Sequence, residues 1–131
     1  SISIADQSAI EGNIKLANEK GLGIIAKRPV ANVVWKHHEK PEDIYFHEYW
    51  NRINKLQFPF LKKTLEESIS IALRWTLSID GLSTAIVGTT NQNHWEQNAK
   101  NIGEGKLSDK EFNEIREFWN EISDDTWIQK T

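Results

Sequence analysis

The stretch that decides the fold is Thr84–Asn98, TAIVGTTNQNHWEQN. The β-branched and apolar residues at its start predict a short strand, Thr84–Val87, and the polar residues after them predict the start of a helix. Gly88 stands between the two, where a residue without a side chain lets the backbone turn tightly or approach a ligand closely. Helix starts of this kind bind phosphate in many α/β proteins. An ordinary loop between a strand and a helix has the same pattern, so anion binding and simple capping both stay open.

Two further stretches have the pattern of strands. Leu22–Lys27 is short and apolar up to its last residue, as buried parallel strands covered on both faces tend to be. Arg28 and Pro29 end it, because proline cannot donate to a ladder of backbone hydrogen bonds. Ser1–Ile4 has the pattern of the end of another strand.

Apolar residues at helical spacing predict helices between and after these strands. Four pairs have the capping-box pattern, in which two side chains satisfy the first free N–H groups of a helix: Ser8 with Glu11, Thr64 with Glu67, Asn93 with Glu96, and Ser108 with Glu111. Asp43–Leu56 is expected to be a helix within the long aromatic-rich segment 30–59, with Ile44, Trp50 and Ile53 turned inward.

The alternation of strands and helices predicts an α/β fold. Strands that are separated by helices pair in parallel through right-handed crossovers, so we expect about three parallel strands with flanking helices. Three strands do not close a barrel, because a full (β/α)8 barrel takes eight strands and about 250 residues.

The composition is that of an ordinary globular domain. Of the 131 residues, 38% are hydrophobic and 27% are charged, and the net charge of −3 offers no basic field for nucleic acid or an anionic membrane. Cysteine is absent, which excludes disulfides and thiolate chemistry. No apolar run approaches the length of a membrane span, and we expect a cytoplasmic location.

Four stretches together resemble the C-terminal half of an aldo-keto reductase. They are Ile4–Gln7 (IADQ), Leu22–Asn32 (LGIIAKRPVAN), Ile71–Ser78 (IALRWTLS) and Thr84–Asn98. They occur in the family's order and cover most of the chain up to about residue 101. The resemblance implies that residues 1–131 are the C-terminal half of a (β/α)8 TIM barrel and carry its cofactor-binding loops. Because the other half is missing, we expect a fragment of a longer protein.

The resemblance implies a site for NADP(H) in the loop and helix that follow Thr84–Val87. The residues expected to bind the cofactor there are Gly88, Thr89, Thr90, Asn91, His94, Gln97 and Asn98. In the family, the positions of Thr90, Asn91 and His94 face the 2′-phosphate, and those of Gln97 and Asn98 lie beside the adenine. Many relatives place arginine or lysine near this phosphate. The nearest candidates here are His94 and, less plausibly, Lys100, which weakens the prediction of NADP over NAD. Simple helix capping, with Trp95 as a packing residue, is the alternative.

The turn after Leu22–Lys27 is the second expected contact with the cofactor. In the family this turn runs along the nicotinamide ribose and the pyrophosphate, often as Ser-Pro-Leu, where this chain has Arg-Pro-Val. By position the contacts are Arg28, Val30 through its backbone, and Asn32. A guanidinium suits a diphosphate. The alternative is that Lys27 and Arg28 are solvated charges at the end of a strand.

The long segment 30–59 offers two weaker signals. The histidines and carboxylate His37, His38, Glu39 and His47 do not have converging metal-ligand spacing, so a surface loop is the better interpretation and no metal is expected. The aromatic side chains of this segment form either a wall for the substrate or part of the core of the missing barrel half.

The catalytic residues of the family, an Asp, a Tyr, a Lys and a His, lie on the half of the barrel that this chain lacks. Tyr45 and Tyr49 stand in the wrong segment, with no obvious activating partner in the sequence. We therefore expect the cofactor-binding part of an NADP(H)-dependent oxidoreductase of small carbonyl compounds, inactive as this chain. The rival is a non-catalytic half-barrel that works by association, because unpaired strand edges invite pairing with another copy.

Overall fold

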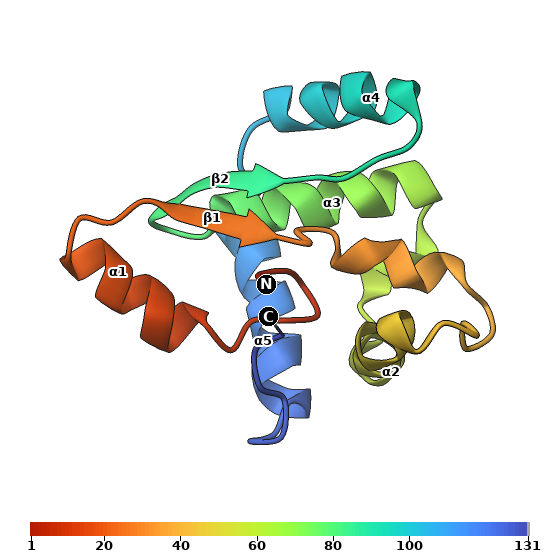
Figure 1. Cartoon of the computed structure of the whole chain (residues 1–131), viewed down its shortest axis with the longest axis horizontal. Coiled ribbons are helices and arrows are strands. Elements are labelled where there is room, and N and C mark those ends of the chain that lie inside the picture. Colours follow the sequence, from red (N-terminus) through yellow and green to blue (C-terminus); the bar gives the residue numbers. More distant parts are fainter. Residues whose placement is uncertain (131) are drawn as a thin grey trace.

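The computed structural model of the chain describes residues 1–130. Two parallel strands, β1 (Ile24–Lys27) and β2 (Leu82–Ile86), lie side by side, with Ala26 opposite Ala85 and Lys27 opposite Ile86 (Figure 1). The helices are α1 (Lys15–Glu19), α2 (His47–Leu56), α3 (Leu65–Ser78), α4 (Gln92–Gly103) and α5 (Asp109–Ile122). Shorter turns are a π-turn at Ile10–Ile14 and 3-10 turns at Ala31–Lys36, Ile44–Phe46 and Pro59–Lys62. The α/β class and the parallel pairing are confirmed.

The expectation of about three strands was wrong for residues 1–130, which contain two. Ile2 donates its N–H to the carbonyl of Lys27 at 3.1 Å, so the N-terminal segment does touch the edge of β1. It forms no strand, because the chain bends back immediately in a bridge between Ser3 and Asp6. This segment therefore extends the sheet by one hydrogen bond only.

The expectation that β1 is covered on both faces was also wrong. Ala26 is fully buried, while Ile25 is 57% exposed and Ile86, on the adjacent strand β2, is 59% exposed. Helix α3 packs against β2, and Thr76 of α3 donates to the carbonyl of Pro29 just beyond β1 at 2.8 Å. No element among residues 1–130 covers the opposite face, so an apolar sheet face stays open.

Two of the four expected helix caps are confirmed. Both Thr64–Glu67 and Ser108–Glu111 form complete capping boxes at the starts of α3 and α5. The Ser8–Glu11 pair does not cap a helix, because the Ser8 hydroxyl donates to Asp6 instead, at 3.4 Å. The Asn93–Glu96 cap was wrong by two residues: Asn91 is the N-cap of α4.

The helix expected at Asp43–Leu56 is confirmed as a 3-10 turn that continues into α2. Its inward face was only partly predicted. Ile53 is buried and Trp50 is half-buried, whereas Ile44 is 81% exposed because it stands at the start of the 3-10 turn.

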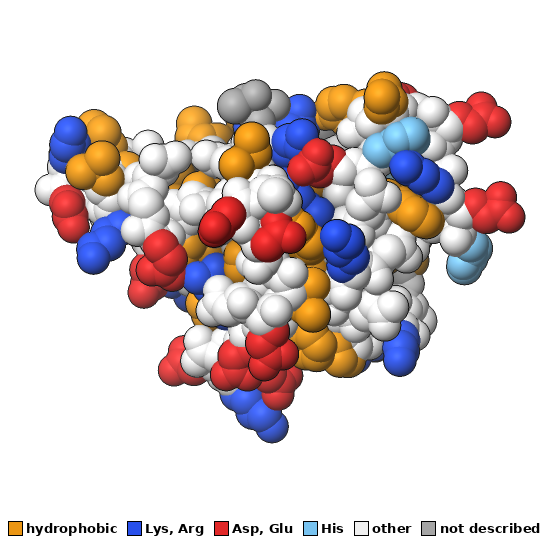
Figure 2. Space-filling model, turned by 90° about the horizontal axis from the view of Figure 1, so that it is seen from below, with side chains coloured by type: hydrophobic (Ala, Val, Ile, Leu, Met, Phe, Trp, Pro, Cys, Tyr) orange, Lys and Arg blue, Asp and Glu red, His pale blue; other side chains and the backbone are white. Residues whose placement is uncertain are grey.

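One core joins the helices to the sheet. Trp75 of α3 is fully buried and stacks on Phe112 of α5, with ring centroids 5.5 Å apart. Phe58, also buried, meets Phe118 of α5 edge to face. On the face seen from below, acidic and basic side chains are mixed rather than gathered by sign (Figure 2).

A buried ion pair ties three distant segments together. The guanidinium of Arg52, 3% exposed on α2, donates to the carbonyls of Ala5 and Ile128 at 3.1 and 2.8 Å and to the Glu48 carboxylate at 2.6 Å. It also lies 3.8 Å from the carboxylate of Asp6, which is fully buried. Burial raises the pKa of Asp6 above its ordinary value despite these partners. The pair therefore holds the chain ends against α2.

Replacing Arg52 with Met should strongly destabilise the fold. The variant keeps most of the side-chain volume but leaves Asp6 buried without its cation, which typically costs about 3–5 kcal/mol. Because burial already raises the pKa of Asp6, a fall in pH protonates that carboxylate and the loss should shrink. Urea unfolding at several pH values measures both effects.

The control is Lys106→Gln, which breaks the exposed pair with Asp80, whose charged atoms are 3.8 Å apart. We expect it to change the free energy of unfolding by less than about 0.5 kcal/mol. A loss below about 1 kcal/mol for the Arg52 variant would show that the buried pair does not hold the fold together.

Candidate functional site

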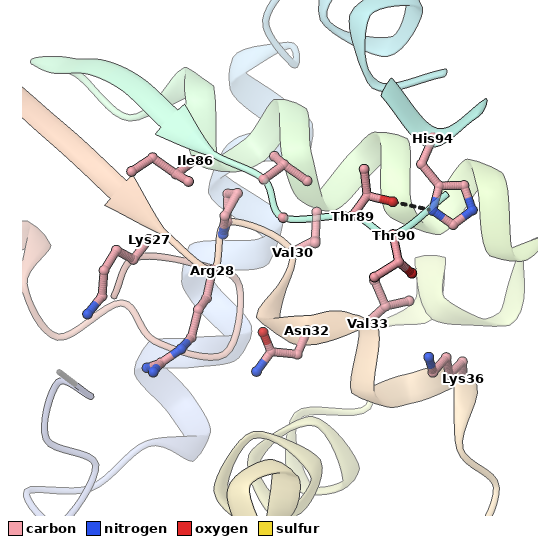
Figure 3. Close-up of a pocket in the computed structure, with 13 residues that line it drawn as sticks. Lys27, Arg28, Val30, Asn32, Val33, Lys36, Ile86, Thr89, Thr90 and His94 are labelled. Atoms are coloured by element: carbon pink, nitrogen blue, oxygen red, sulfur yellow. Dashed lines mark hydrogen bonds between the residues drawn. The ribbon is translucent and has the colours of Figure 1, made fainter. Parts of the chain in front are cut away.

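The carboxyl ends of β1 and β2 open into a cleft. The two strands end side by side, and the loops that follow them enclose a cavity of about 760 Å³ (Figure 3). The first loop contributes Lys27, Arg28, Pro29, Val30, Asn32, Val33 and Lys36 to its walls, and the second contributes Ile86, Val87, Gly88, Thr89, Thr90 and His94. Crevices at the carboxyl ends of parallel strands are the usual ligand sites of α/β folds.

The backbone of the first loop is strained. Arg28, Ala31, Asn32 and Val33 all have positive φ angles, between 46° and 56°. Asparagine tolerates this left-handed region, whereas a β-branched residue such as Val33 rarely adopts it. Strain of this kind persists only where the surroundings hold it, and it concentrates at functional sites.

The anchors of the strained loop lie on both sides of it. Thr76 holds the carbonyl of Pro29, and Val34 is fully buried. The indole N–H of Trp35 donates to the Ser68 hydroxyl at 2.9 Å. Lys36, the next residue, is exposed and lines the cleft, so a mobile cationic side chain stands on a fixed backbone.

Arg28 is held at one end of the cleft by aromatic neighbours. Its Nε donates to the Tyr45 hydroxyl at 2.8 Å, and its guanidinium lies 5.1 Å from the centre of the same ring. Another of its N–H groups donates to the Ser1 hydroxyl at 3.0 Å. Burial disfavours the cation, but hydrogen bonds with Tyr45 and Tyr49 raise the pKa of Arg28 overall. A permanent positive charge therefore stands at this end.

The second loop forms its own hydrogen-bonded turn before α4. The Thr89 hydroxyl accepts the N–H of Asn91 and lies 3.1 Å from Nδ1 of His94, an interaction drawn in Figure 3. The Asn91 side chain accepts the N–H of Asn93 at 3.0 Å and lines neither cavity described here. The structure thus uses Asn91 to cap α4 and leaves Thr90 and His94 on the wall of the cleft.

A second cavity of about 440 Å³ continues the cleft along α4. It shares Lys36, Gly88 and His94 with the first cavity, among other residues. Gln97, Asn98 and Asn101 line it from α4, and Leu65 and Ile69 line it from α3. The two cavities together form one elongated cleft with Arg28 at one end and the amides of α4 at the other.

Nine of the ten residues predicted to bind a cofactor line this cleft. Arg28, Val30, Asn32, Gly88, Thr89, Thr90 and His94 line the first cavity, and Gln97 and Asn98 line the second. Asn91 caps the helix, and Lys100, the weaker candidate cation, lines neither cavity.

The sequence reasoning missed Lys36 and Asn101. Lys36 lies in a loop without a helical or strand period, so no pattern in the sequence shows where its side chain stands. Asn101 could have been found, since it follows Gln97 by four residues and so shares its face of α4.

The two tyrosines have hydrogen-bond partners in the structure. Tyr45 accepts a hydrogen bond from Arg28, and the buried Tyr49 donates to the Asp6 carboxylate at 3.1 Å. Burial raises the pKa of Tyr49 to about 12, with the Asp6 charge adding to the effect. A proton donor for catalysis at neutral pH needs the opposite shift, so this environment does not activate Tyr49.

Comparison with known families gives one match. The family model described as "Aldo/keto reductase family" matches residues 1–120 of the 131. The chain belongs to the aldo/keto reductase family. Searches of curated proteins and of solved structures found no match.

The aldo/keto reductase chain shows no metal centre or membrane helix within residues 1–130. No group of three or more histidines and carboxylates is placed to hold a metal ion. None of the helices combines the length and the apolar character that a bilayer crossing requires.

Proposed function

We propose that this chain is the cofactor-binding C-terminal half of an aldo/keto reductase barrel and that it holds NADP(H) in the cleft at the ends of β1 and β2. Family membership makes oxidoreductase chemistry the starting point. The shape of the cleft supports the binding of NADP(H), because an elongated site with a cation at one end and amides at the other suits a dinucleotide.

The order of groups along the cleft supports the following proposal for where each part of the cofactor binds. Arg28, the backbone of Val30, and Asn32 lie at the end where the pyrophosphate and the nicotinamide ribose would bind. His94 lies at the junction of the two cavities and Thr90 lines the first, and both would face the 2′-phosphate. The adenine would then rest beside Gln97 and Asn98. When bound, NADPH supplies the hydride that reduces a small carbonyl compound.

Gly88 is the residue on which the proposal of a bound cofactor mainly rests. It lines both cavities, and a Cβ atom added to it would meet nothing within 4 Å. Its φ angle lies outside the left-handed region that favours glycine, so neither the backbone nor packing within the described chain requires glycine here. A side chain at Gly88 would fill space in the cleft, which is why its absence fits a ligand that lies against the backbone.

Replacing Gly88 with Leu should remove cofactor binding and leave the fold intact. We expect the affinity for NADPH to fall by at least about ten-fold, because the new side chain occupies the cleft. The melting temperature should change by less than about 2 °C, since no atom is displaced. Titration calorimetry and a thermal melt measure the two quantities.

Gly103→Leu is the matched control, because a Cβ at Gly103 also meets nothing within 4 Å and the residue lines neither cavity. It should bind NADPH like the unmodified chain. If Gly88→Leu also binds normally, the cofactor does not lie against this loop.

Lys36 supplies the cation that relatives place near the 2′-phosphate. It lines both cavities where they meet, as His94 does, and Figure 3 shows it on the side of Thr90 and His94, away from Arg28. Glu66 lines the second cavity as Lys36 does, and its carboxylate would compete for this lysine when no phosphate is bound. An exposed lysine loses little by turning from solvent to a phosphate dianion.

Lys36→Gln should weaken NADPH and spare NADH. A hydrogen bond to a charged group typically contributes about 1.5–3 kcal/mol, so we expect roughly ten-fold weaker NADPH binding and a change below about two-fold for NADH. Fluorescence titration of both cofactors at low and physiological salt measures this difference, which should narrow as salt screens the charge.

Lys100→Gln is the control for the loss of one positive charge. Lys100 is exposed on α4 and lines neither cavity, so its replacement should alter neither affinity. Equal weakening of both cofactors by Lys36→Gln would contradict the assignment to the 2′-phosphate.

We further propose that the chain does not catalyse by itself. The family's Asp, Tyr, Lys and His belong to the half of the barrel that this sequence does not match. Tyr49, the buried tyrosine nearest to the cleft residue Arg28, has its pKa raised to about 12 and so holds its proton too tightly. What the residues of this chain can do is bind and orient a cofactor.

The rival function is association through the open sheet face. Ile25 and Ile86 stand more than half exposed on adjacent strands, an arrangement that favours covering by another protein surface. We expect the isolated chain to form a dimer or larger species, because the exposed strand edges and this face then find partners. Light scattering after size-exclusion chromatography measures the mass.

The double variant Ile25→Lys, Ile86→Lys should shift the chain to monomer, since two charges cannot be buried on that face without partners. A compact monomer with a sharp, cooperative melt in the unmodified chain would exclude self-association.

A further inference from the structure

Asn101 on α4 has an unpartnered donor in a buried place. The residue is 2% exposed. Its Oδ1 accepts a hydrogen bond from Nε2 of Gln97 at 3.2 Å, which fixes which atom of the amide is the acceptor. Its Nδ2 then finds no acceptor among residues 1–130. Buried polar groups are almost always paired, so an orphaned amide N–H group calls for an explanation.

The position of Asn101 supplies that explanation. It lines the second cavity together with Gln97 and Asn98, which share its side of α4. Across the cavity stand apolar side chains of α3 and of the first loop, among them Leu65 and Val33. The polar side chains of Lys36, Glu66 and His94 also line this cavity. A cavity that combines apolar side chains with amide groups on one side suits a flat heteroaromatic ring.

We propose that the Nδ2 group of Asn101 donates a hydrogen bond to a ring nitrogen of the adenine base of a nucleotide bound in this cavity. The proposal rests on the proposed function, which brings an adenine nucleotide into the cleft. Gln97 positions the donor, because its own hydrogen bond occupies the oxygen of Asn101 and leaves only the NH₂ group for the ligand. A ring nitrogen of adenine is an acceptor and matches it.

The geometry implies that folding and binding make opposite demands on Asn101. In the free chain the orphaned N–H group costs stability, and a side chain of similar size without polar atoms would remove that cost. In the complex the same group gains its partner. A residue with only a structural role would show the reverse, since its loss would lower stability first.

The test is the variant Asn101→Leu in the full 131-residue chain, with 5′-AMP, NADPH and NADH as ligands. We expect all three to bind about ten-fold more weakly, because each carries the adenine. The melting temperature of the free variant should stay the same or rise. Calorimetry and thermal melts give the two readouts, neither of which depends on catalysis.

Ser70→Ala is the matched control. The Ser70 hydroxyl is the other buried side-chain group without a partner in the described chain, and Ser70 lines neither cavity of the cleft. Its replacement should leave the melting temperature unchanged or raised and should leave all three affinities unchanged. The contrast separates loss of a ligand contact from removal of an orphaned polar group.

A second measurement changes the ligand and compares binding to the unmodified chain with binding to Asn101→Leu. The 1-deaza, 3-deaza and 7-deaza analogues of 5′-AMP each lack one ring nitrogen of adenine. One of them should bind the unmodified chain about ten-fold more weakly than 5′-AMP and should lose nothing further with Asn101→Leu.

The inference is overturned if Asn101→Leu binds 5′-AMP as the unmodified chain does, or if all three analogues bind like 5′-AMP. It is also overturned if the melting temperature of the variant falls along with its affinity, because the weaker binding would then follow from a damaged fold. Failure of the unmodified chain to bind any of the nucleotides would instead remove the proposed function itself.

Discussion

The buried charges of Asp6 and Arg52 constrain the whole arrangement. Each charge helps to stabilise the other in the interior, where an unpaired charge is far costlier than a paired one. Glu48 gives Arg52 a second carboxylate at 2.6 Å, and Tyr49 and the backbone N–H of Lys130 donate to Asp6. Arg52 also takes the carbonyls of Ala5 and Ile128, so one guanidinium binds segments that are 123 residues apart in sequence (128 − 5). Two stretches with little regular structure of their own are thereby fixed to helix α2.

Hydrogen bonds connect this buried ion pair to Arg28, which lines the cleft. Asp6 accepts a hydrogen bond from Tyr49, and the neighbouring turn presents Tyr45 to the guanidinium of Arg28. A cation held in this way is oriented before any ligand arrives, which lowers the entropy lost on binding. Where the two cavities meet, Lys36 stands on an anchored backbone with its side chain exposed, so its charge can turn toward a ligand.

Local patterns were predictable and distant ones were not. The capping boxes at Thr64 and Ser108 involve residues three apart, so the sequence contains all of the information. The cap at Asn93 failed because a competing side chain, Asn91, stood two residues earlier with the same chemistry. The exposure of Ile25 and the position of Lys36 depend on which elements pack nearby. A strand pattern shows that a face is apolar, but it does not show whether another element covers that face.

Three features that break local rules lie at the cleft and at the sheet that leads to it. Val33 has a left-handed backbone, Asn101 buries an unpaired donor, and Ile86 exposes an apolar side chain, and all three line the two cavities or their edge. Each feature costs folding free energy, and none has a counterpart that would offset it within the described chain. Such costs persist where something else is gained. A ligand that covers the loop and accepts a hydrogen bond from Asn101 would offset the first two of these costs in free energy. A protein surface that covers the sheet would offset the third. Binding and assembly at this end of the molecule would therefore both lower the free energy of the chain.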